Sequence, residues 1–184
     1  MLDQPNPLPN PTKLNYIIQW GSKRDLLDSC KLERELLGEE TYWEDERVLH
    51  WYHRLALLAK RIRDEDDNLI AYISALSISP KAYASIQTSK IHPWNLTYQD
   101  IDPLSKHYWI GGALVRPEHQ RKGIMTQLYN ELNKAIGDNI IADAYSDKAE
   151  RFMEKNNWTL LTTKDTPLYL HPKGKNYLSS PIPN

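Results

Sequence analysis

Residues 108–136 constrain the fold more than any other segment, because they predict a strand, a charged turn and a helix in immediate succession. The segment 108–115 is rich in β-branched and aromatic residues, which favours a strand. Pro117 ends that strand, since proline cannot donate to a β-ladder. Apolar residues then recur at helical spacing over 124–136, and Gly137 follows where a helix would stop.

The turn between the predicted strand and helix carries two cations and a glycine, in the order Gln120, Arg121, Lys122, Gly123. The first N–H groups of a helix lack intrahelical partners, and the helix dipole is positive at that end. Glycine lets the backbone approach a ligand without a Cβ in the way. These features together predict a site for a phosphate or pyrophosphate group.

The same stretch resembles the signature of the GNAT superfamily, the acetyl-CoA-dependent N-acetyltransferases. Gln120 and Gly123 match the family pattern Gln/Arg-x-x-Gly-x-Gly/Ala, whereas Met125 occupies its third position. A second segment, 146–158, resembles the family's Asn-x-x-Ala-x-x-hydrophobic-Tyr-Glu-Lys-x-Gly-Phe block. One Gln-x-x-Gly is a weak signal, but two blocks at the right separation on the right elements are a strong one. Together they span residues 108–163.

The resemblance implies an α/β (α+β) fold, with a mixed, mostly antiparallel central sheet of six to seven strands flanked by helices. It also implies a helical insertion between the third and fourth strands. Acetyl-CoA is the implied co-substrate, and no metal is expected. Backbone N–H groups of the turn would hold its pyrophosphate, and the strand end would pair with its pantetheine arm. The implied cofactor-binding residues are Leu114, Val115, Gln120, Arg121, Lys122, Gly123, Ile124, Met125, Thr126 and Ser146.

The activity that the resemblance implies is transfer of the acetyl group to a primary amine by direct attack in a ternary complex. Such a reaction needs a deprotonated amine and a protonated leaving thiolate. The family's usual acid is a tyrosine, but Met153 stands at that position, and the stretch 109–112 lacks the family's frequent carboxylate base. Tyr145 as acid and Asp143 as base, acting through water, are the nearest substitutes. Strand alternation predicts that they do not both face the cofactor.

Several alternatives stay open at this point. Water can deprotonate the amine and solvent can protonate the thiolate. A non-catalytic acyl-CoA-binding module on the same fold is the second interpretation, motivated by Met153 and the missing carboxylate. The acceptor is a small-molecule or peptide amine: polyamine, amino acid, antibiotic, ribosomal protein and peptide N-terminus all remain candidates. Acetylation of aminoacyl-tRNA is disfavoured, because a net charge of −1 provides no basic stripe.

Composition narrows the class of protein further. The chain has 184 residues, and we expect one domain over 13–172, with a proline-rich arm at 1–12 and a tail at 173–184. The charge of −1 gives no electrostatic reason for a nucleic-acid partner or an anionic membrane. Cys30 is the single cysteine, no apolar run approaches about 20 residues, and the N-terminus lacks the features of a signal peptide. We therefore expect a cytoplasmic protein without a membrane segment.

The remaining elements follow from periodicity and from turn residues. The aromatic residues Tyr42, Trp43, Trp51 and Tyr52 either line a substrate groove or pack on the sheet. The segment 79–106 covers the acceptor site, forms a homodimer contact or is a passive excursion. We expect strands at 15–20, 55–63, 69–78, 139–145, 158–162 and 167–170, and helices at 24–37, 42–54, near 80–90 and at 147–156.

Overall fold

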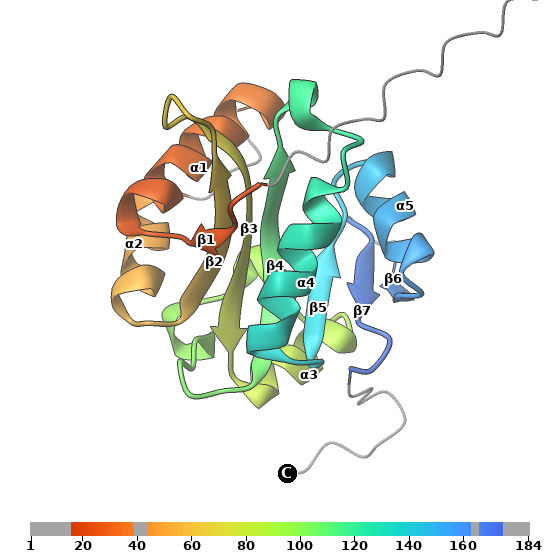
Figure 1. Ribbon diagram of the computed structural model, residues 1–184. Helices are drawn as coiled ribbons and strands as arrows, with labels where there is room; N and C mark the ends of the chain where they lie inside the picture. The colour runs from red at the N-terminus through yellow and green to blue at the C-terminus, as the bar shows by residue number, and fades with distance from the viewer. Residues whose placement is uncertain (1–15, 39–43, 163–165, 175–184) are drawn as a thin grey trace, which may run out of the picture.

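The fold was examined in a computed structural model that describes residues 16–38, 44–162 and 166–174. Helices cover both faces of one central sheet (Figure 1). The predicted arm at 1–12, most of the predicted tail, and Tyr42 and Trp43 lie outside the described residues. The elements are β1 (Gln19–Trp20), α1 (Lys23–Leu37), α2 (Asp45–His53), β2 (Leu57–Arg63), β3 (Leu69–Ile78), α3 (Pro80–Gln87), η2 (Pro93–Asn95), η3 (Tyr98–Asp100), β4 (His107–Val115), η4 (Pro117–His119), α4 (Ile124–Ile136), β5 (Ile140–Asp143), α5 (Asp147–Lys155), β6 (Thr159–Thr162) and β7 (Leu168–Leu170).

The sheet has seven strands in the order β1-β2-β3-β4-β5-β7-β6. Every neighbouring pair is antiparallel except β4 and β5, which run parallel. The helix α4 makes the crossover between these two strands, as a parallel connection requires. The predicted mixed, mostly antiparallel sheet of six to seven strands, with a helical insertion before the fourth, is therefore confirmed.

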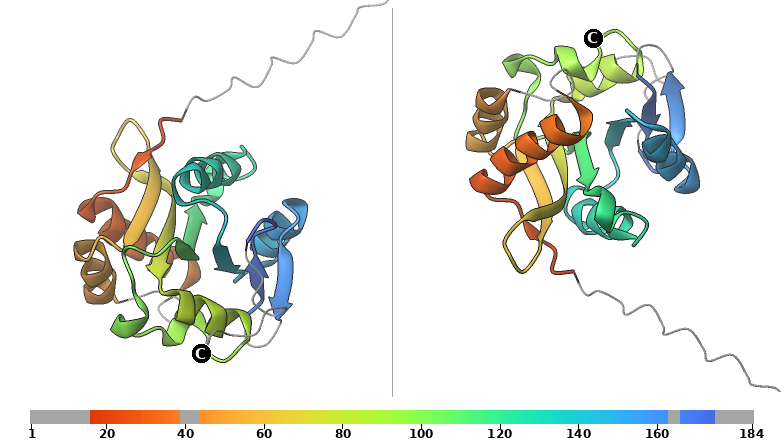
Figure 2. Two further views of the ribbon diagram at one scale, coloured as in Figure 1. Left: turned by 90° about the horizontal axis from the view of Figure 1, so that it is seen from below. Right: turned by 90° about the horizontal axis from the view of Figure 1, so that it is seen from above.

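The hydrophobic core has two halves, one on each face of the sheet (Figure 2). Helices α1, α2 and α3 pack on one face, and α4 and α5 pack on the other. Alternation along the strands divides the side chains between the two halves. Trp109 and Ile141 belong to the α1 half, whereas Ile110 and Ala142 belong to the α4 half. The residue after Ala142 consequently faces α1.

The glycine pair of β4 marks an irregular point in the sheet. The register between β3 and β4 shifts between Ser74 and Leu76, so β4 carries a bulge there. A Cβ on Gly111 would lie 2.3 Å from the Trp109 ring, and one on Gly112 would lie 2.8 Å from the Ser74 hydroxyl oxygen. Larger residues at these two positions would displace those neighbours.

The strands β4 and β5 separate just after this point. Their parallel pairing runs from Tyr108 to Ile110 on β4 and stops before Gly111. Strand β5 itself ends at Asp143, while β4 continues to Val115 along β3. The second half of β4 therefore has no strand partner on the β5 side, and its backbone borders the space between the two strands.

The insertion between β3 and β4 is packed onto the α1 half of the core. Leu96 is fully buried, and its carbonyl oxygen accepts a hydrogen bond of 2.5 Å from Nη2 of Arg47 on α2. Trp94 packs edge-to-face against Tyr145, with ring centroids 5.8 Å apart. Of the three predicted roles, this packing argues against a passive excursion, while acceptor coverage and a homodimer contact stay predictions.

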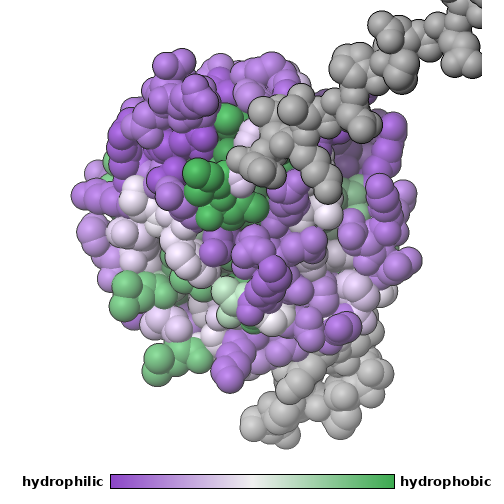
Figure 3. Space-filling model, in the orientation of Figure 1, coloured by the Kyte–Doolittle hydropathy of each residue, from purple (hydrophilic) through white to green (hydrophobic). Residues whose placement is uncertain are grey.

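The face drawn in Figure 3 is mainly hydrophilic outside the grey atoms, with hydrophobic residues in separate groups. This face therefore offers no broad apolar surface, which directs attention to the cavities. Within the described ranges, no helix is long and apolar enough to cross a membrane.

Candidate active site

A cavity of about 520 Å³ lies where β4 and β5 separate. Its walls are the second half of β4, the turn and first residues of α4, the end of β5 and the start of α5. Helix α1 contributes Glu33 and Leu37 from the opposite face of the sheet. The volume matches the few hundred to about a thousand Å³ typical of small-molecule sites.

The turn before α4 presents bare helix N–H groups to this cavity. Gly123 is the N-cap, with φ of 74°, and no side chain caps the helix there. A Cβ on Gly123 would meet no protein atom within 4 Å, so the space beside it is open. Arg121 also has a positive φ, of 63°. The backbone conformation thus leaves the start of the helix uncapped and open, a geometry suited to an anion.

The Gln120 side chain connects this turn to β4 and α5 through two hydrogen bonds. Its Nε2 donates a hydrogen bond of 3.0 Å to the carbonyl oxygen of Val115 at the end of β4. Its Oε1 accepts a hydrogen bond of 2.7 Å from Nζ of Lys148 on α5. Gln120 therefore links the strand end to α5, and Lys148 is a cation that the sequence patterns did not single out.

Charges of opposite sign enter the cavity from different elements. Arg121, Lys148 and Arg151 supply cations from the starts of α4 and α5. Glu33 and Asp143 supply carboxyl groups from α1 and the end of β5. The cavity therefore combines a positive region suited to an anionic ligand with an acidic region suited to an amine.

Most of the predicted cofactor-binding residues meet at this cavity. Lys122 is the exception, because it does not line the cavity and its side chain is exposed. Met125 lines the wall and is half-buried, and Met153 on α5 is buried beside it. The nine that line the cavity are Leu114, Val115, Gln120, Arg121, Gly123, Ile124, Met125, Thr126 and Ser146.

Asp143 and Tyr145 both line the cavity, so the expectation that alternation would separate them is wrong. Strand β5 ends at Asp143, and strand alternation therefore no longer governs Tyr145. The Tyr145 hydroxyl donates a hydrogen bond of 2.9 Å to Oδ2 of Asp143. Burial raises the pKa of Asp143 to about 7, against the lowering effect of that hydrogen bond. Burial and the neighbouring Asp143 carboxylate raise the pKa of Tyr145 well above its ordinary value.

Glu33 is a site residue that the sequence patterns did not single out. It lies on α1, its side chain is nine-tenths buried, and the Tyr72 hydroxyl donates a hydrogen bond to its Oε1. Burial, with a smaller contribution from the Asp143 carboxylate, raises the pKa of Glu33 to about 8. One sequence signal could have revealed it: with Leu26, Cys30 and Leu37, the residue falls on the apolar stripe of the helix.

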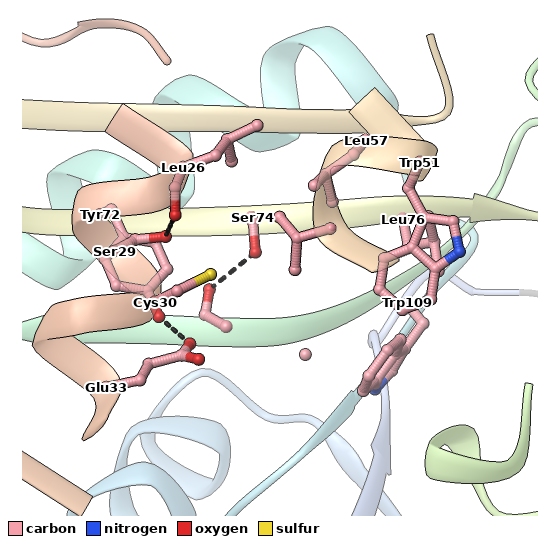
Figure 4. Close-up of a pocket in the computed structure, with 13 residues that line it drawn as sticks. Leu26, Ser29, Cys30, Glu33, Trp51, Leu57, Tyr72, Ser74, Leu76 and Trp109 are labelled. Carbon is pink, nitrogen blue, oxygen red and sulfur yellow. Dashed lines mark hydrogen bonds between the residues drawn. The ribbon is translucent and has the colours of Figure 1, made fainter. Parts of the chain in front are cut away.

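A second, smaller cavity of about 30 Å³ lies between α1, α2 and the sheet (Figure 4). It shares Glu33, Gly111 and Gly112 with the large cavity. Figure 4 shows Glu33 at one end of the group of side chains, and Trp51 and Trp109 at the other. The glycine pair and Glu33 therefore stand where the two cavities meet.

The single cysteine and the aromatic residues of α2 lie in or against the core. Burial raises the pKa of the Cys30 thiol to about 12, so it stays protonated and is a core residue. Trp51 is buried and lines the small cavity, whereas Tyr52 packs against the core without lining either cavity. Among the described residues, no group of three or more His, Cys, Asp or Glu side chains is arranged to hold a metal ion.

Comparisons with known proteins agree with this architecture. The crystal structure of Arabidopsis thaliana NAA60 in complex with acetyl-CoA matches with a TM-score of 0.58 at 13% identity, over 84% of this chain and 96% of that one. The structure of the same protein in complex with a bisubstrate analogue matches with a TM-score of 0.55 at 15% identity, over 83% of this chain and 95% of that one. A GNAT-family acetyltransferase from Staphylococcus aureus Mu50 matches with a TM-score of 0.58 at 10% identity, over 86% of this chain and 99% of that one. No curated protein sequence matches.

These identities are low, so the structural matches show the fold alone. The family itself is shown by sequence. The family model described as Acetyltransferase (GNAT) family matches residues 20–158, which include both cavities' strands and the predicted turn. This chain belongs to the GNAT acetyltransferase family.

Proposed function

We propose that this protein transfers the acetyl group of acetyl-CoA to a primary amine by direct attack within a ternary complex. The observation that supports this most is the cavity between β4 and β5, into which the uncapped start of α4 opens. One site holds the donor and the acceptor together, so no covalent enzyme intermediate is needed. A small-molecule or peptide amine is the acceptor that we propose.

Binding of acetyl-CoA follows from the chemistry of the walls. The pyrophosphate accepts hydrogen bonds from the N–H groups at the start of α4, and Arg121 and Lys148 supply positive charge beside it. The unpaired edge of β4 at Leu114 and Val115 offers backbone groups to the amide-containing pantetheine arm. The thioester then lies near Gly111 and Gly112, where the absence of side chains leaves room. Arabidopsis thaliana NAA60, which has a similar fold, forms a complex with acetyl-CoA, and this supports acetyl-CoA as the donor.

The groups at the inner part of the cavity match the needs of the reaction. Attack of the amine nitrogen on the thioester carbon forms a C–N bond and breaks the C–S bond. The departing thiolate needs a proton, and we propose that the Tyr145 hydroxyl delivers it. In the structure that hydroxyl donates a hydrogen bond to Asp143, and it must turn from Asp143 to the sulfur to deliver its single proton. We assign Asp143 a positioning role, because its Oδ2 holds the hydroxyl before this transfer.

A non-catalytic acyl-CoA-binding module is the second candidate. It is favoured by one observation: Met153, at the family's acid position, lines the cavity and cannot donate a proton. A module of this kind would bind CoA with the same residues and would turn over no acceptor. We also propose a cytoplasmic location and a homodimer contact through the insertion.

The experiment that tests the proposal has two measurements. The first is the thermal midpoint with and without CoA and acetyl-CoA, which must rise when a ligand binds the native state alone. The second is mass-spectrometric detection of acetylated product in a panel of primary amines with acetyl-CoA. A raised midpoint with a product supports the transferase, and a raised midpoint without any product supports the binding module. No change in the midpoint with millimolar CoA would count against both.

A further inference from the structure

The two cavities meet at one carboxyl group, that of Glu33, and this position is the basis of an inference that rests on the proposed function. Glu33 lines both the large cavity and the small one. Its Oε1 would lie 3.1 Å from a Cβ placed on Gly112. Because Gly112 has no side chain, the carboxyl group stands directly against the β4 backbone where the thioester of the donor is proposed to lie.

A carboxyl group in such surroundings is unusual enough to need a reason. Glu33 occupies the apolar stripe of α1, between Cys30 and Leu37, where a leucine would bury more apolar surface at no polar cost. Burying an acid beside apolar side chains costs free energy unless it is hydrogen-bonded. Within the part of the chain that the structure describes, the Tyr72 hydroxyl donates a hydrogen bond to this carboxyl group. One hydrogen bond leaves further acceptor capacity on the carboxyl group, directed to the junction of the cavities.

We propose that Glu33 is the catalytic base of the acetyl transfer, and that it binds the acceptor amine at the junction of the two cavities. The acceptor ammonium first gives one proton to the Glu33 carboxylate, which passes it to solvent, and the lone pair of the neutral nitrogen then attacks the thioester carbon. As the C–N bond forms and the C–S bond breaks, the nitrogen gives a second proton to Glu33. The sulfur gains one proton from Tyr145 or from solvent, and Tyr145 regains its proton from solvent. Glu33 then releases its second proton to solvent, so the sum of the steps is amide, free CoA and one proton in solution.

This assignment gives the two carboxyl groups of the cavity different roles, one at the sulfur that leaves and the other at the nitrogen that attacks. Asp143 is engaged by the Tyr145 hydroxyl and serves the leaving sulfur. Glu33 comes from α1 and serves the incoming nitrogen. The acceptor is consequently a cationic primary amine with a slender end. The small cavity has room for about one or two water-sized groups, which is too little for a bulky substituent at the nitrogen.

The ionisable groups around Glu33 define how its activity depends on pH. Asp143 from β5 disfavours the carboxylate, and Arg34 on the same helix favours it. Tyr72 from β3 donates to it, and the carboxylate in turn raises the pKa of the Cys30 thiol. Burial raises the pKa of Glu33 to about 8, so the base becomes available as pH rises through about 8.

The test uses the full chain with Glu33→Gln, which keeps the size of the side chain and an oxygen for the Tyr72 hydrogen bond. Glu35→Gln is the matched control, because Glu35 lies on the same helix with an exposed side chain that pairs with Arg116. The acceptors are spermidine, lysine and a hexapeptide with a free N-terminus. We expect Glu33→Gln to lower kcat/KM for the best of these acceptors by about 10²–10⁴-fold. The CoA-induced rise in thermal midpoint should remain, and Glu35→Gln should behave as the wild type.

Two further measurements distinguish a base from a structural residue. With hydroxylamine, an amine that is already neutral near pH 7, the defect of Glu33→Gln should shrink, because less proton removal is needed before attack. Tyr72→Phe should shift the rising limb of the pH–rate profile to higher pH, because the carboxylate loses a hydrogen bond that stabilises it.

The outcomes separate this inference from the proposed function. If the wild type turns over an acceptor and kcat/KM of Glu33→Gln stays within threefold of the wild-type value at every pH, Glu33 is not the base. The proposed transferase activity would still stand. Turnover that is lost in Asp143→Asn but retained in Glu33→Gln would show that Asp143, and not Glu33, is the base. Absence of turnover by the wild type with all four amines would overturn both. Loss of the CoA-induced rise in Glu33→Gln would show a structural role and also overturn the assignment.

Discussion

The Tyr145 hydroxyl donates a hydrogen bond of 2.9 Å to Asp143 two residues earlier, just where β5 ends. The ring of Tyr145 also packs edge-to-face on Trp94, so two contacts fix its orientation. A tyrosine ring held in this way needs only a rotation of its hydroxyl group to turn its proton from Asp143 toward the cavity. That arrangement provides a concrete test of the proposed acid.

We expect Tyr145→Phe to lower kcat by about 10²–10⁴-fold while leaving KM for acetyl-CoA unchanged. Phenylalanine retains the ring contact with Trp94, so a loss of rate would not reflect a packing defect. Because the pKa of Tyr145 is raised above its ordinary value of 10, the hydroxyl stays protonated through the assay range. The loss should therefore be similar from about pH 6 to about pH 9. Steady-state kinetics at several pH values is the measurement, and an unchanged rate at all of them would assign proton delivery to solvent.

Helix α4 has a glycine at each end. Gly123 and Gly137 cap the two ends of this helix with φ of 74° and 78°, and a Cβ on either would meet no protein atom within 4 Å. Glu at either position costs about 1–2 kcal/mol of stability from the left-handed backbone. Gly123→Glu should in addition weaken CoA binding by roughly 10- to 100-fold, the value of charge-assisted hydrogen bonds worth about 1.5–3 kcal/mol.

Calorimetric titration with CoA checks this prediction. Gly137→Glu has the same added charge and backbone strain at the far end of the helix, and it should bind CoA like the wild type. Equal binding by the two variants would show that the phosphates do not lie at the start of α4.

Met125 differs from the small residue that the family has at this position, and we predict that a shorter side chain there raises the affinity for CoA. Met125 lines the cavity and is half-buried, at a position where the family has a small residue. We expect Met125→Ala to lower the Kd for CoA by about threefold or more, because the shorter side chain admits the cofactor more closely. The lost packing should cost less than the about 2–5 kcal/mol of a fully buried methionine. Gln127→Ala is the control, because the Gln127 side chain is exposed on the same helix. Weaker CoA binding by Met125→Ala would mean that the thioether contacts the ligand.

The buried carboxyl groups predict an unusual dependence of stability on pH. The pKa of Glu33 is raised from 4.5 to about 8, and that of Asp143 from 3.8 to about 7. The native state thus retains protons that the unfolded chain has released, so the free energy of unfolding falls as pH rises from about 4 to about 8. Glu33→Gln and Asp143→Asn should each reduce this slope and raise the thermal midpoint at pH 8. Urea unfolding at a series of pH values measures it, and a slope unchanged in both variants would contradict the raised pKa values.

Local patterns in the chain were enough to predict most of the secondary structure and the cofactor side of the cavity. Helix α4 and the turn before it depend on Pro117, Gly123 and Gly137, whose backbone preferences act within a few residues of themselves. Nine of the ten residues expected to bind the cofactor, within 114–126 and at 146, line the cavity for the same reason. The anion-binding start of α4 is made by the backbone of consecutive residues, so its location can be predicted from the sequence.

The acceptor side could not be predicted in this way, because its groups come from segments far apart in the chain. Glu33 reaches Gly112 and Tyr72 only because α1 packs across the sheet, 39 residues from Tyr72. The pKa values of Glu33 and Asp143 depend on burial that no local pattern reports. Alternation failed for Tyr145 because the end of β5 is decided by its pairing with β4 and β7. Sequence by itself determined where a helix starts with uncapped N–H groups, and tertiary packing decided which carboxyl groups meet, since burial and proximity are properties of the assembled core.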